Sequence, residues 1–251
     1  MYQKDFWEKL KEFTAARIAV GRTGSSVPTD YLLQFQLAHA KARDAVYASL
    51  DIELLKEELQ KLSVQVLEVN SKATDRATYL KRPDLGRQLS EQSAEKLKAL
   101  NSTAYDICFV LADGLSAFAI DQNSIPLLKA ILPKLKDYSI APVCIAQQSR
   151  VALGDEIAYL LKSRMVIMLI GERPGLSAAD SMGVYITYNP EPGVTDERRN
   201  CISNIRQGGL HPAFAADKLF YLINEAFRLK LTGVALKEDH ISSIEGQKQI
   251  N

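Results

Sequence analysis

Three short segments of the sequence carry polar or charged side chains directly after stretches of apolar residues. They are Asp113–Gly114, Ser149–Val151 and Gly171–Gly175. In the last of these, Glu172 and Arg173 place an acid beside a base, between two glycines that permit tight backbone paths and before a proline that stiffens the turn. Such a loop could offer a ligand both charge and hydrogen bonds. The alternative is a sharp connecting loop in which the acid and the base are simply solvated.

A fourth segment, CISNIRQGGLHP, begins at Cys201 and leads into a predicted helix. Its adjacent glycines would let the backbone approach a ligand or a partner closely. Cys201 itself has two interpretations. A lone cysteine is most often a buried free thiol, but it can also be a soft, shape-filling contact in a ligand pocket.

Cysteine and histidine are too scattered to build a metal site. The chain has three cysteines and three histidines, and they form neither a paired-cysteine nor a His-Glu-x-x-His pattern. We therefore expect no metal ligand among the side chains. The sequence also lacks a Gly-x-Ser-x-Gly motif and an obvious catalytic triad. This favours a binding surface over a complete active site.

Nucleotide-binding fingerprints are absent as well. Neither Gly-x-Gly-x-x-Gly nor Gly-x-x-x-x-Gly-Lys-Ser/Thr occurs in the chain. The stretch GRTGSS has two glycines but no lysine, and it is more typical of a turn than of a phosphate loop. A stand-alone Rossmann-like enzyme acting on a nucleotide or a small phosphorylated ligand is the alternative function, and these absences argue against it.

Alternating strands and helices must position the candidate segments. An uninterrupted run of Met, Val, Ile and Leu residues, such as Met165–Ile170, is typical of a strand buried on both faces of a parallel sheet. The predicted strands are Ile107–Leu111, Ala141–Ala146, Met165–Ile170 and Val184–Tyr188, and the predicted helices are Ser124–Lys136, Asp155–Lys162 and Pro212–Lys230. This order predicts an α/β, Rossmann-like layered fold with a mainly parallel sheet. Because ligands bind beyond the carboxyl ends of parallel strands, the candidate loops should lie side by side.

The region before these strands is predicted to be mostly helical. We divide the chain into a short amphipathic segment (1–16), a mostly helical region (17–104), a Rossmann-like domain (105–236) and a polar tail (237–251). The mostly helical region is expected to hold a short strand or extended segment over Arg17–Val20 and helices from Thr29 or Asp30 onward, over Ile52–Leu62 and over Arg87–Leu100. The first 16 residues should pack on the body of the protein or, alternatively, serve as an address or docking peptide for a larger assembly.

The composition excludes several classes of partner. The chain is 47% hydrophobic and 24% charged, as in an ordinary packed protein. Its formal net charge of +1 argues against a nucleic-acid partner, which usually needs a basic excess. The longest apolar runs are far shorter than the roughly 20 residues that span a bilayer, and the N-terminus lacks the apolar stretch of a secretory signal. We therefore expect a cytoplasmic protein with no membrane partner.

Several motifs together give the chain a family resemblance. From about Ala16 to Leu229 it contains, in order, ARIAVGRTGSS, FQLAHAKARDAV, YLKRPDLGRQL, ADGLSAFAI, IGERPGL and CISNIRQGGLHP. Each motif is weak alone, but RPDLGR, GERPGL and CISNIRQGG together are highly specific. The chain resembles the small (light) subunit of ethanolamine ammonia-lyase.

The resemblance implies a partner and a cofactor. Enzymes of this family combine a large barrel subunit with a small subunit and hold adenosylcobalamin between them. Homolysis of the cobalt–carbon bond starts a radical reaction that converts ethanolamine to acetaldehyde and ammonia. The large subunit carries the substrate-handling residues, so this chain would cover the cofactor and supply no catalytic residue of its own.

The resemblance also implies three cofactor contacts. Val151 matches the position after the arginine in the Ser149–Val151 segment. Glu172 matches the acid of GERPG, and Cys201 matches the cysteine that opens CISNIRQGG. A carboxylate can accept hydrogen bonds from the amide groups at the corrin rim, whereas Val151 and Cys201 offer apolar and soft surface. Arg150, Arg173 and Asp113 are neighbouring candidates. The chain lacks an Asp-x-His-x-x-Gly motif, so the cofactor is expected to stay base-on, with no protein ligand to cobalt.

Some members of the family carry a longer N-terminal leader and belong to an ethanolamine-processing microcompartment. In this sequence only about sixteen residues precede the matching region. This departure from the pattern favours the open cytoplasm, and a bacterial microcompartment is the alternative location, with residues 1–16 as the candidate targeting helix.

Overall fold

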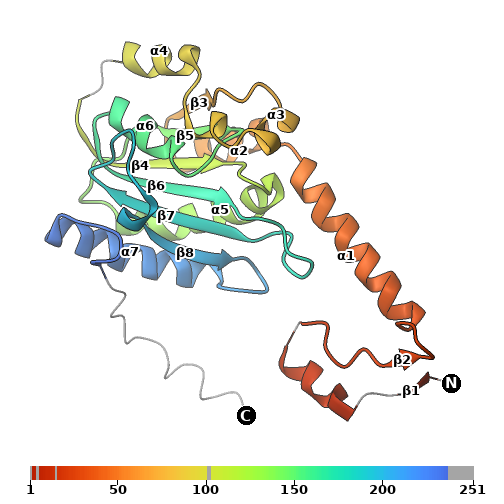
Figure 1. Ribbon diagram of the computed structural model, residues 1–251. Helices are drawn as coiled ribbons and strands as arrows, with labels where there is room; N and C mark the ends of the chain where they lie inside the picture. The colour runs from red at the N-terminus through yellow and green to blue at the C-terminus, as the bar shows by residue number, and fades with distance from the viewer. Residues whose placement is uncertain (1, 4–5, 15, 101–102, 237–251) are drawn as a thin grey trace.

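The fold is built around a six-stranded sheet whose strand order is β3-β5-β4-β6-β7-β8 (Figure 1). A computed structural model of the chain describes residues 2–3, 6–14, 16–100 and 103–236. The strands are β3 (Val66–Asn70), β4 (Tyr105–Ala112), β5 (Val143–Gln147), β6 (Ser163–Gly171), β7 (Met182–Tyr188) and β8 (Asn200–Ile205). Helices cover both faces, so the predicted α/β layered fold is confirmed. The polar tail predicted for 237–251 lies outside the described residues.

The first four strands of this order are parallel to one another, as predicted, and the last two reverse. β6 pairs antiparallel with β7, and β7 pairs antiparallel with β8. The physical reason is the short connection after β6. Ten residues, 172–181, link β6 to β7, and a parallel return needs a crossover of a dozen or more residues, usually a helix. The sheet is therefore mixed, and its reversed end consists of the antiparallel strands β7 and β8.

Two groups of helices enclose two apolar cores. On one face lie α2 (Ile52–Lys61), α5 (Ala117–Ile131) and α7 (Pro212–Leu229). On the other face lie α4 (Glu91–Ala99) and α6 (Leu153–Leu160). These last two helices pack over β3 and β6. Side chains of β7 and β8 on the same face, including Tyr185 and Cys201, consequently reach the surface.

Several predicted boundaries are wrong, and capping explains two of them. α5 begins at Ala117 rather than at Ser124, because the Ser116 side chain accepts a hydrogen bond from the Ala119 N–H and caps the helix. The helix predicted from Arg87 begins at Glu91, after a Ser90 cap. The 3-10 helix η2 (Leu85–Arg87) lies at the start of the helix predicted from Arg87, and the 3-10 helix η3 (Leu132–Lys134) lies at the end of the helix predicted from Ser124.

The region 17–104 contributes a strand that was not predicted. β3 pairs in parallel with β5, from Val66 opposite Val143 onward, and forms one edge of the sheet. Arg17–Val20 forms no strand, so the strand interpretation of that segment is wrong. Instead, β2 (Arg22–Thr23) pairs with β1 (Tyr2–Gln3). The short helix α3 (Arg76–Lys81) was also missed.

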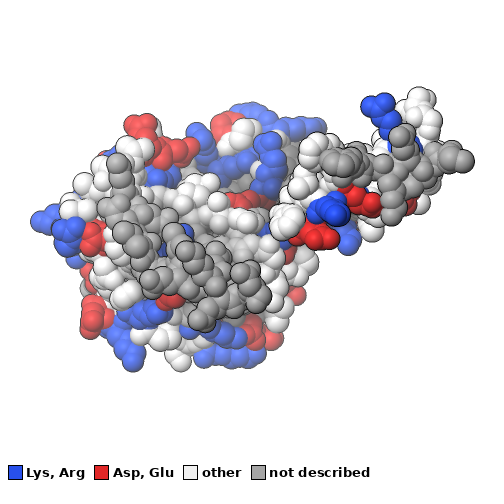
Figure 2. Space-filling view, turned by 90° about the horizontal axis from the view of Figure 1, so that it is seen from below, with Lys and Arg blue, Asp and Glu red and all other residues white. Residues whose placement is uncertain are grey.

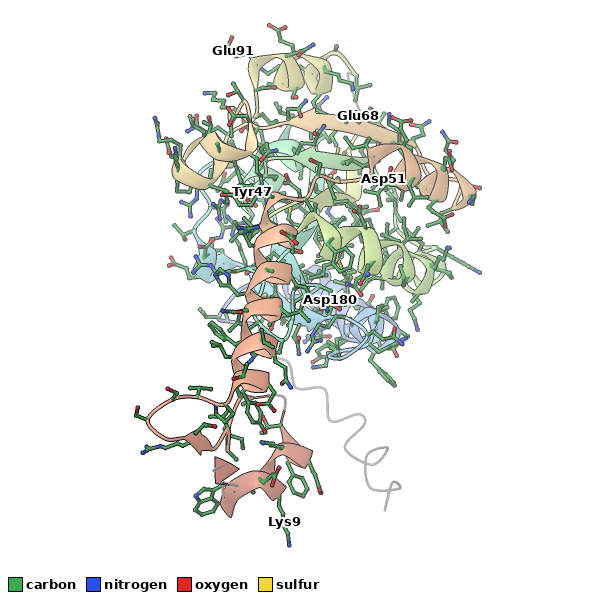
Figure 3. The ribbon with its side chains drawn as sticks, turned by 90° about the vertical axis from the view of Figure 1, so that its right-hand side faces the viewer. Lys9, Tyr47, Asp51, Glu68, Glu91 and Asp180 are labelled. Atoms are coloured by element: carbon green, nitrogen blue, oxygen red, sulfur yellow. The ribbon has the colours of Figure 1, made fainter. Side chains whose placement is uncertain are left out.

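An arm projects from this body. It consists of β1, the 3-10 helix η1 (Phe6–Phe13), β2 and the helix α1 (Thr29–Tyr47). Figure 3 shows α1 running from Tyr47, beside the body, to the hooked N-terminal part that contains Lys9, and Figure 2 shows the arm standing out from the rest of the surface. Ala45 is the only buried residue of α1. None of the helices in the described residues is long and apolar enough to cross a membrane.

Candidate functional site

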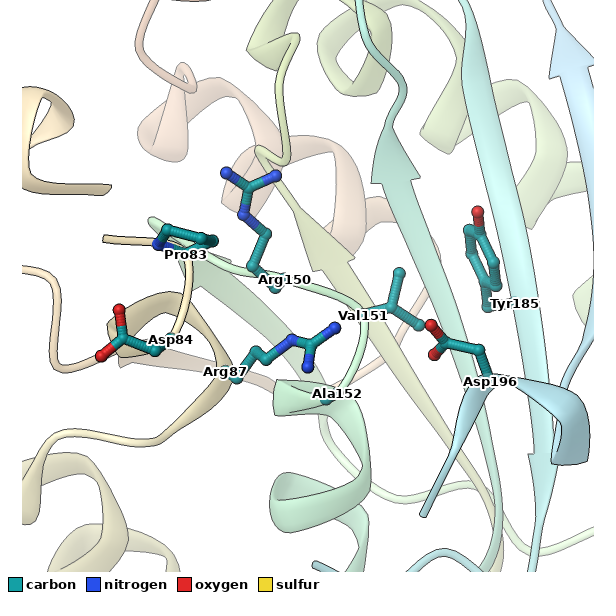
Figure 4. Close-up of a pocket in the computed structure, with 8 residues that line it drawn as sticks. All are labelled: Pro83, Asp84, Arg87, Arg150, Val151, Ala152, Tyr185 and Asp196. Atoms are coloured by element: carbon teal, nitrogen blue, oxygen red, sulfur yellow. The ribbon is translucent and has the colours of Figure 1, made fainter. Parts of the chain in front are cut away.

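A cavity of about 490 Å³ opens where the reversed end of the sheet meets the start of α6. Figure 4 shows the loop before η2 on one side, the turn that leads into α6 in the middle, and β7 on the other side. Its lining residues are Pro83, Asp84, Arg87, Arg150, Val151, Ala152, Tyr185 and Asp196. The cavity therefore joins residues from three distant parts of the chain, and one of them is the predicted contact Val151.

Hydrogen bonds between loops hold the turn that carries Val151. The Arg150 N–H donates to the Gly86 carbonyl at 2.8 Å, and the buried Tyr79 hydroxyl donates to the Ser149 carbonyl at 2.9 Å. Burial raises the pKa of Tyr79, so its hydroxyl stays a donor. A side chain at Gly86 would approach a ring carbon of Tyr79 to 2.9 Å. This turn is therefore fixed before any ligand arrives.

Asp113 holds the same turn in place through hydrogen bonds to its backbone. Its carboxylate accepts hydrogen bonds from the Gln148 N–H at 2.8 Å and the Ser149 N–H at 3.0 Å, and from Arg76 at 3.3 Å. The side chain is only 7% exposed. Asp113 was a candidate contact on sequence grounds, but its partners make it a structural support of the turn.

Tyr185 occupies the centre of the site and was not predicted from the sequence. Its side chain lines the cavity beside Val151, and its backbone lies directly opposite Cys201 in the β7–β8 ladder. The Tyr185 hydroxyl and the Cys201 thiol lie close enough for each to shift the pKa of the other. Desolvation, with the nearby Cys201 and Glu172 charges, raises the pKa of Tyr185 to about 12. Tyr185 therefore remains neutral at physiological pH.

Cys201 is an exposed thiol, unlike Cys108 and Cys144, which are buried. Neighbouring groups exclude part of the water around its sulfur and raise its pKa, an effect that the neighbouring Tyr185 hydroxyl opposes and the Glu172 charge reinforces. Of the two interpretations made from the sequence, the buried thiol is wrong. Cys201 presents a neutral, soft surface at the edge strand.

One carboxylate oxygen of Glu172 is fixed and the other is free. Oε2 accepts hydrogen bonds from the Ser181 hydroxyl and from the Asn204 N–H, the latter at 3.2 Å. Within the described residues no hydrogen bond reaches Oε1, which lies over Gly183. A Cβ at Gly183 would come within 3.0 Å of this atom. Glu172 is therefore a positioned hydrogen-bond acceptor on the same face of β7 as Tyr185.

A buried ion pair braces the far wall of the cavity. Arg199 binds Asp155 through two hydrogen bonds of 2.7 Å, and both side chains are almost inaccessible to solvent. Arg199 also donates to the Val194 carbonyl at 2.7 Å and to Asp196 at 3.0 Å. The pair thereby ties the first turn of α6 to the loop before β8, which carries the cavity-lining residue Asp196.

Comparison with known proteins decides the family. The family model described as ethanolamine ammonia-lyase light chain (EutC) matches residues 4–237. A protein of Pseudomonas fluorescens (strain Pf0-1) named ethanolamine ammonia-lyase small subunit is 48% identical over 96% of this chain and 90% of its own length. The chain belongs to the ethanolamine ammonia-lyase light-chain family.

Other light-chain relatives are equally similar. A small subunit of Xanthomonas campestris pv. campestris is 50% identical over 94% of this chain and 89% of its own length. One of Azotobacter vinelandii is 47% identical over 96% of this chain and 91% of its own length. The resemblance found from the sequence motifs is thus confirmed over nearly the whole chain.

The structure places the three contacts that the light-chain resemblance implies around one side chain. Val151 lines the cavity beside Tyr185, Cys201 lies opposite Tyr185 in the β7–β8 ladder, and the charge of Glu172 acts on both Tyr185 and Cys201. Sequence reasoning missed Tyr185 because its role follows from the pairing of β7 with β8. Arg173, another neighbouring candidate, is exposed and lies outside the cavity lining.

No metal-binding group forms from the described side chains. Nowhere in the described residues do three or more histidine, cysteine, aspartate or glutamate side chains gather closely enough to hold a metal ion. His211 caps α7, where its Nδ1 accepts a hydrogen bond from the Ala213 N–H at 3.3 Å. The polar groups of the site are the free oxygen of Glu172, the carboxylates of Asp84 and Asp196, one thiol, one phenol and two guanidinium groups, a set that suits an organic ligand with amide groups.

Proposed function

We propose that this chain is the small subunit of an adenosylcobalamin-dependent ethanolamine ammonia-lyase, in which it covers the cofactor against a large catalytic subunit. The observation that carries the proposal is the gathering of Val151, Glu172 and Cys201 around Tyr185. Family membership suggested these residues one by one. Their convergence on one open face of the sheet is the arrangement that a shared cofactor site requires.

The residues fit a corrinoid by their chemistry. Glu172 Oε1 lacks a hydrogen-bond partner among the described residues and can accept an N–H from a corrin amide. Val151 and Tyr185 supply apolar surface, and Cys201 supplies a neutral thiol. When bound, adenosylcobalamin supplies radical chemistry by homolysis of its cobalt–carbon bond. This chain binds and orients the cofactor and excludes water from one side, and it contributes no catalytic acid or base.

We further propose that the cofactor binds base-on, with its own dimethylbenzimidazole on cobalt. None of the residues that line the cavity is a histidine. Electron paramagnetic resonance of the Co(II) state in nitrogen-15-labelled complex tests this. We expect no hyperfine coupling to protein nitrogen, and such coupling would contradict base-on binding.

The large subunit is the proposed partner of the arm. The relatives are named small subunits, which implies a larger partner. α1 presents Leu33 and Leu37, four residues apart and each 58% exposed, as one apolar stripe. A helix with so little packing of its own gains stability from a partner surface. Ethanolamine is bound mainly by the large subunit in this proposal, and the complex works in the cytoplasm, free or inside a microcompartment.

The test of the proposed function is reconstitution. The chain is co-expressed with the adjacent large-subunit gene, and the purified complex is assayed for ethanolamine deamination with and without adenosylcobalamin. We expect activity only from the complex and only with the cofactor. Activity from this chain alone would contradict the shared site and support the alternative of a stand-alone enzyme.

A pair of variants then tests the role of Glu172. Glu172→Ala removes the free acceptor and should weaken cofactor binding by about 10- to 100-fold, the cost of about 1.5–3 kcal/mol for a charge-assisted hydrogen bond. Gly183→Ala keeps the carboxylate but displaces it, and we expect a smaller loss. Equilibrium binding of cyanocobalamin to the complex measures both. Unchanged affinity in Glu172→Ala would rule out this contact.

A further inference from the structure

The base of the arm, at the C-terminal end of α1, is held by a side chain of the body. Ala45 is the only buried residue of α1, and the last turn of this helix contains no basic side chain to complement its negative end. Arg76 of α3 supplies that charge from outside, because its Nε donates a hydrogen bond of 2.6 Å to the Val46 carbonyl. Arg76 therefore caps the helix that carries the arm.

The same guanidinium contacts two side chains that fix the turn that carries Val151. Its Nη1 donates to Asp113 at 3.3 Å, and the Asp113 carboxylate accepts the Ser149 N–H. The guanidinium also lies 4.9 Å from the ring centre of Tyr79, whose hydroxyl donates to the Ser149 carbonyl. Arg76 thus links the base of the arm to both of the residues that hold the Ser149 backbone.

Arg76 is suited to this link by its shape and its burial. Its side chain is 14% exposed, and while Nε binds the Val46 carbonyl, Nη1 donates to the Gly114 carbonyl at 2.9 Å. A lysine could carry the charge, but its compact ammonium lacks the planar fork that reaches both partners at once. Nη2 is buried and has no hydrogen-bond partner in the part of the chain that the structure describes. Because an unpaired buried donor is unfavourable, a small shift that brings Nη2 an acceptor would be stabilised.

We propose that Arg76 is a positioning residue that couples the seating of the arm to the order of the turn that carries Val151. When the large subunit holds α1, the Val46 carbonyl is held against Arg76, and Arg76 is held against Asp113 and Tyr79. The turn then opens less often. Arg76 does not line the cavity, so it acts through these neighbours. The inference rests on the proposed function, in which the arm docks on the large subunit, and adds to it a link between docking and the cofactor site.

Hydrogen exchange of this turn in the cofactor-free complex tests the coupling. Mass spectrometry follows the peptide that contains the Gln148 and Ser149 amide groups, in the free chain and after the large subunit is added. We expect the large subunit to slow their exchange by about 10-fold, the scale of one hydrogen bond. Arg76→Gln removes the charge and Arg76→Lys removes only the planar fork, and each should abolish most of this slowing. Circular dichroism establishes that each variant is folded, and Arg76→Lys carries the test if Arg76→Gln does not fold.

Arg17→Gln is the matched control. Arg17 makes another hydrogen bond between the arm and the body, to the Leu176 carbonyl at 3.3 Å on a different loop, so the slowing should remain in this variant.

Three outcomes would overturn the coupling. They are equal slowing in the unaltered chain and in the Arg76 variants, as direct cover of the turn would produce, no slowing in the unaltered chain, and loss of the slowing in Arg17→Gln as well. Failure of the unaltered chain to form a complex with the large subunit would instead overturn the proposed function. The two failures are therefore distinguishable.

Discussion

The body and the arm of this chain use apolar residues in opposite ways. In the body, every residue from Ile107 to Ala112 on β4 is fully buried, between helices on both faces of the sheet. In the arm, Trp7 is 59% exposed and Phe13 is 83% exposed. On α1, Leu33 and Leu37 are also mostly exposed. The sheet of the body thus buries its apolar side chains within one chain, whereas the arm leaves most of its large apolar side chains exposed.

We therefore expect the body to determine the stability of the free chain and the arm to determine its assembly with a partner. Burial of apolar surface stabilises a fold by about 25 cal/mol per Å², and the body gains that stabilisation within one chain. Exposed apolar side chains on a projecting helix gain it only when a second surface covers them. Substitutions in the body should therefore lower the free energy of unfolding of the free chain. Substitutions on the arm should lower the affinity of the chain for the large subunit. Two experiments test this separation, and a third tests the electrostatics of the exposed part of the body.

The largest effect is expected for Asp155→Ala in the body. It leaves the buried Arg199 guanidinium without its bidentate partner, and breaking such a pair costs about 3–5 kcal/mol. Urea denaturation of the free chain measures the loss. Asp196→Ala is the matched control, because Asp196 contacts the same arginine but is 76% exposed, and it should cost about 1 kcal/mol at most. Equal effects of the two variants would show that the buried pair does not brace the body.

A smaller effect, and on a different quantity, is expected for the double variant Leu33→Ala/Leu37→Ala on the arm. The free energy of unfolding of the free chain should change by no more than about 0.5 kcal/mol, since both side chains are exposed. Affinity for the large subunit should fall by about 30-fold or more, as apolar burial worth about 2–4 kcal/mol is lost. Calorimetric titration measures the affinity, with Gln36→Ala as the control. Unchanged affinity would show that this stripe is not the docking surface.

The smallest effect concerns Cys201, on the face of β7 and β8 that lies beyond α4 and α6. Its raised pKa means less thiolate at a given pH, so alkylation by iodoacetamide should accelerate only at a higher pH than for an ordinary thiol. Glu172→Gln removes a negative charge that disfavours the thiolate, so the rate curve should move to lower pH. Mass spectrometry follows the reaction, with the buried Cys108 and Cys144 as internal controls. A rate curve unmoved by Glu172→Gln would contradict the electrostatic link between the two residues.

The strands that the sequence predicted are those with uninterrupted apolar residues. β4 and β6 are buried on both faces, so every position is apolar and the signal is strong. β8 was missed because Ser203 and Asn204 together face the single residue Gly183, and this bulge breaks the period of two. Asn204 has a φ of 58°, the backbone conformation that accommodates the extra residue. An edge strand with such a bulge leaves no regular pattern in the sequence.

The site was predicted only in part for a related reason. Local sequence identified the loops after the parallel strands, and the family resemblance then implied Val151 and Glu172 within them as contacts. Tyr185 lies inside a strand, and Arg87 lies in a turn far earlier in the chain. Neither has a local signature, because each acquires its role from contacts between distant segments.

The sequence by itself determined the α/β class, the family and the residue types available to a ligand. These follow from the local periodicity of apolar residues and from motifs that are contiguous in the sequence. Tertiary structure decided that β7 reverses direction and that Tyr185 lies among Val151, Glu172 and Cys201. It also decided that α1 stands away from the body. The physical reason is that strand register, helix coverage and charge pairing are long-range contacts, which no window of neighbouring residues contains.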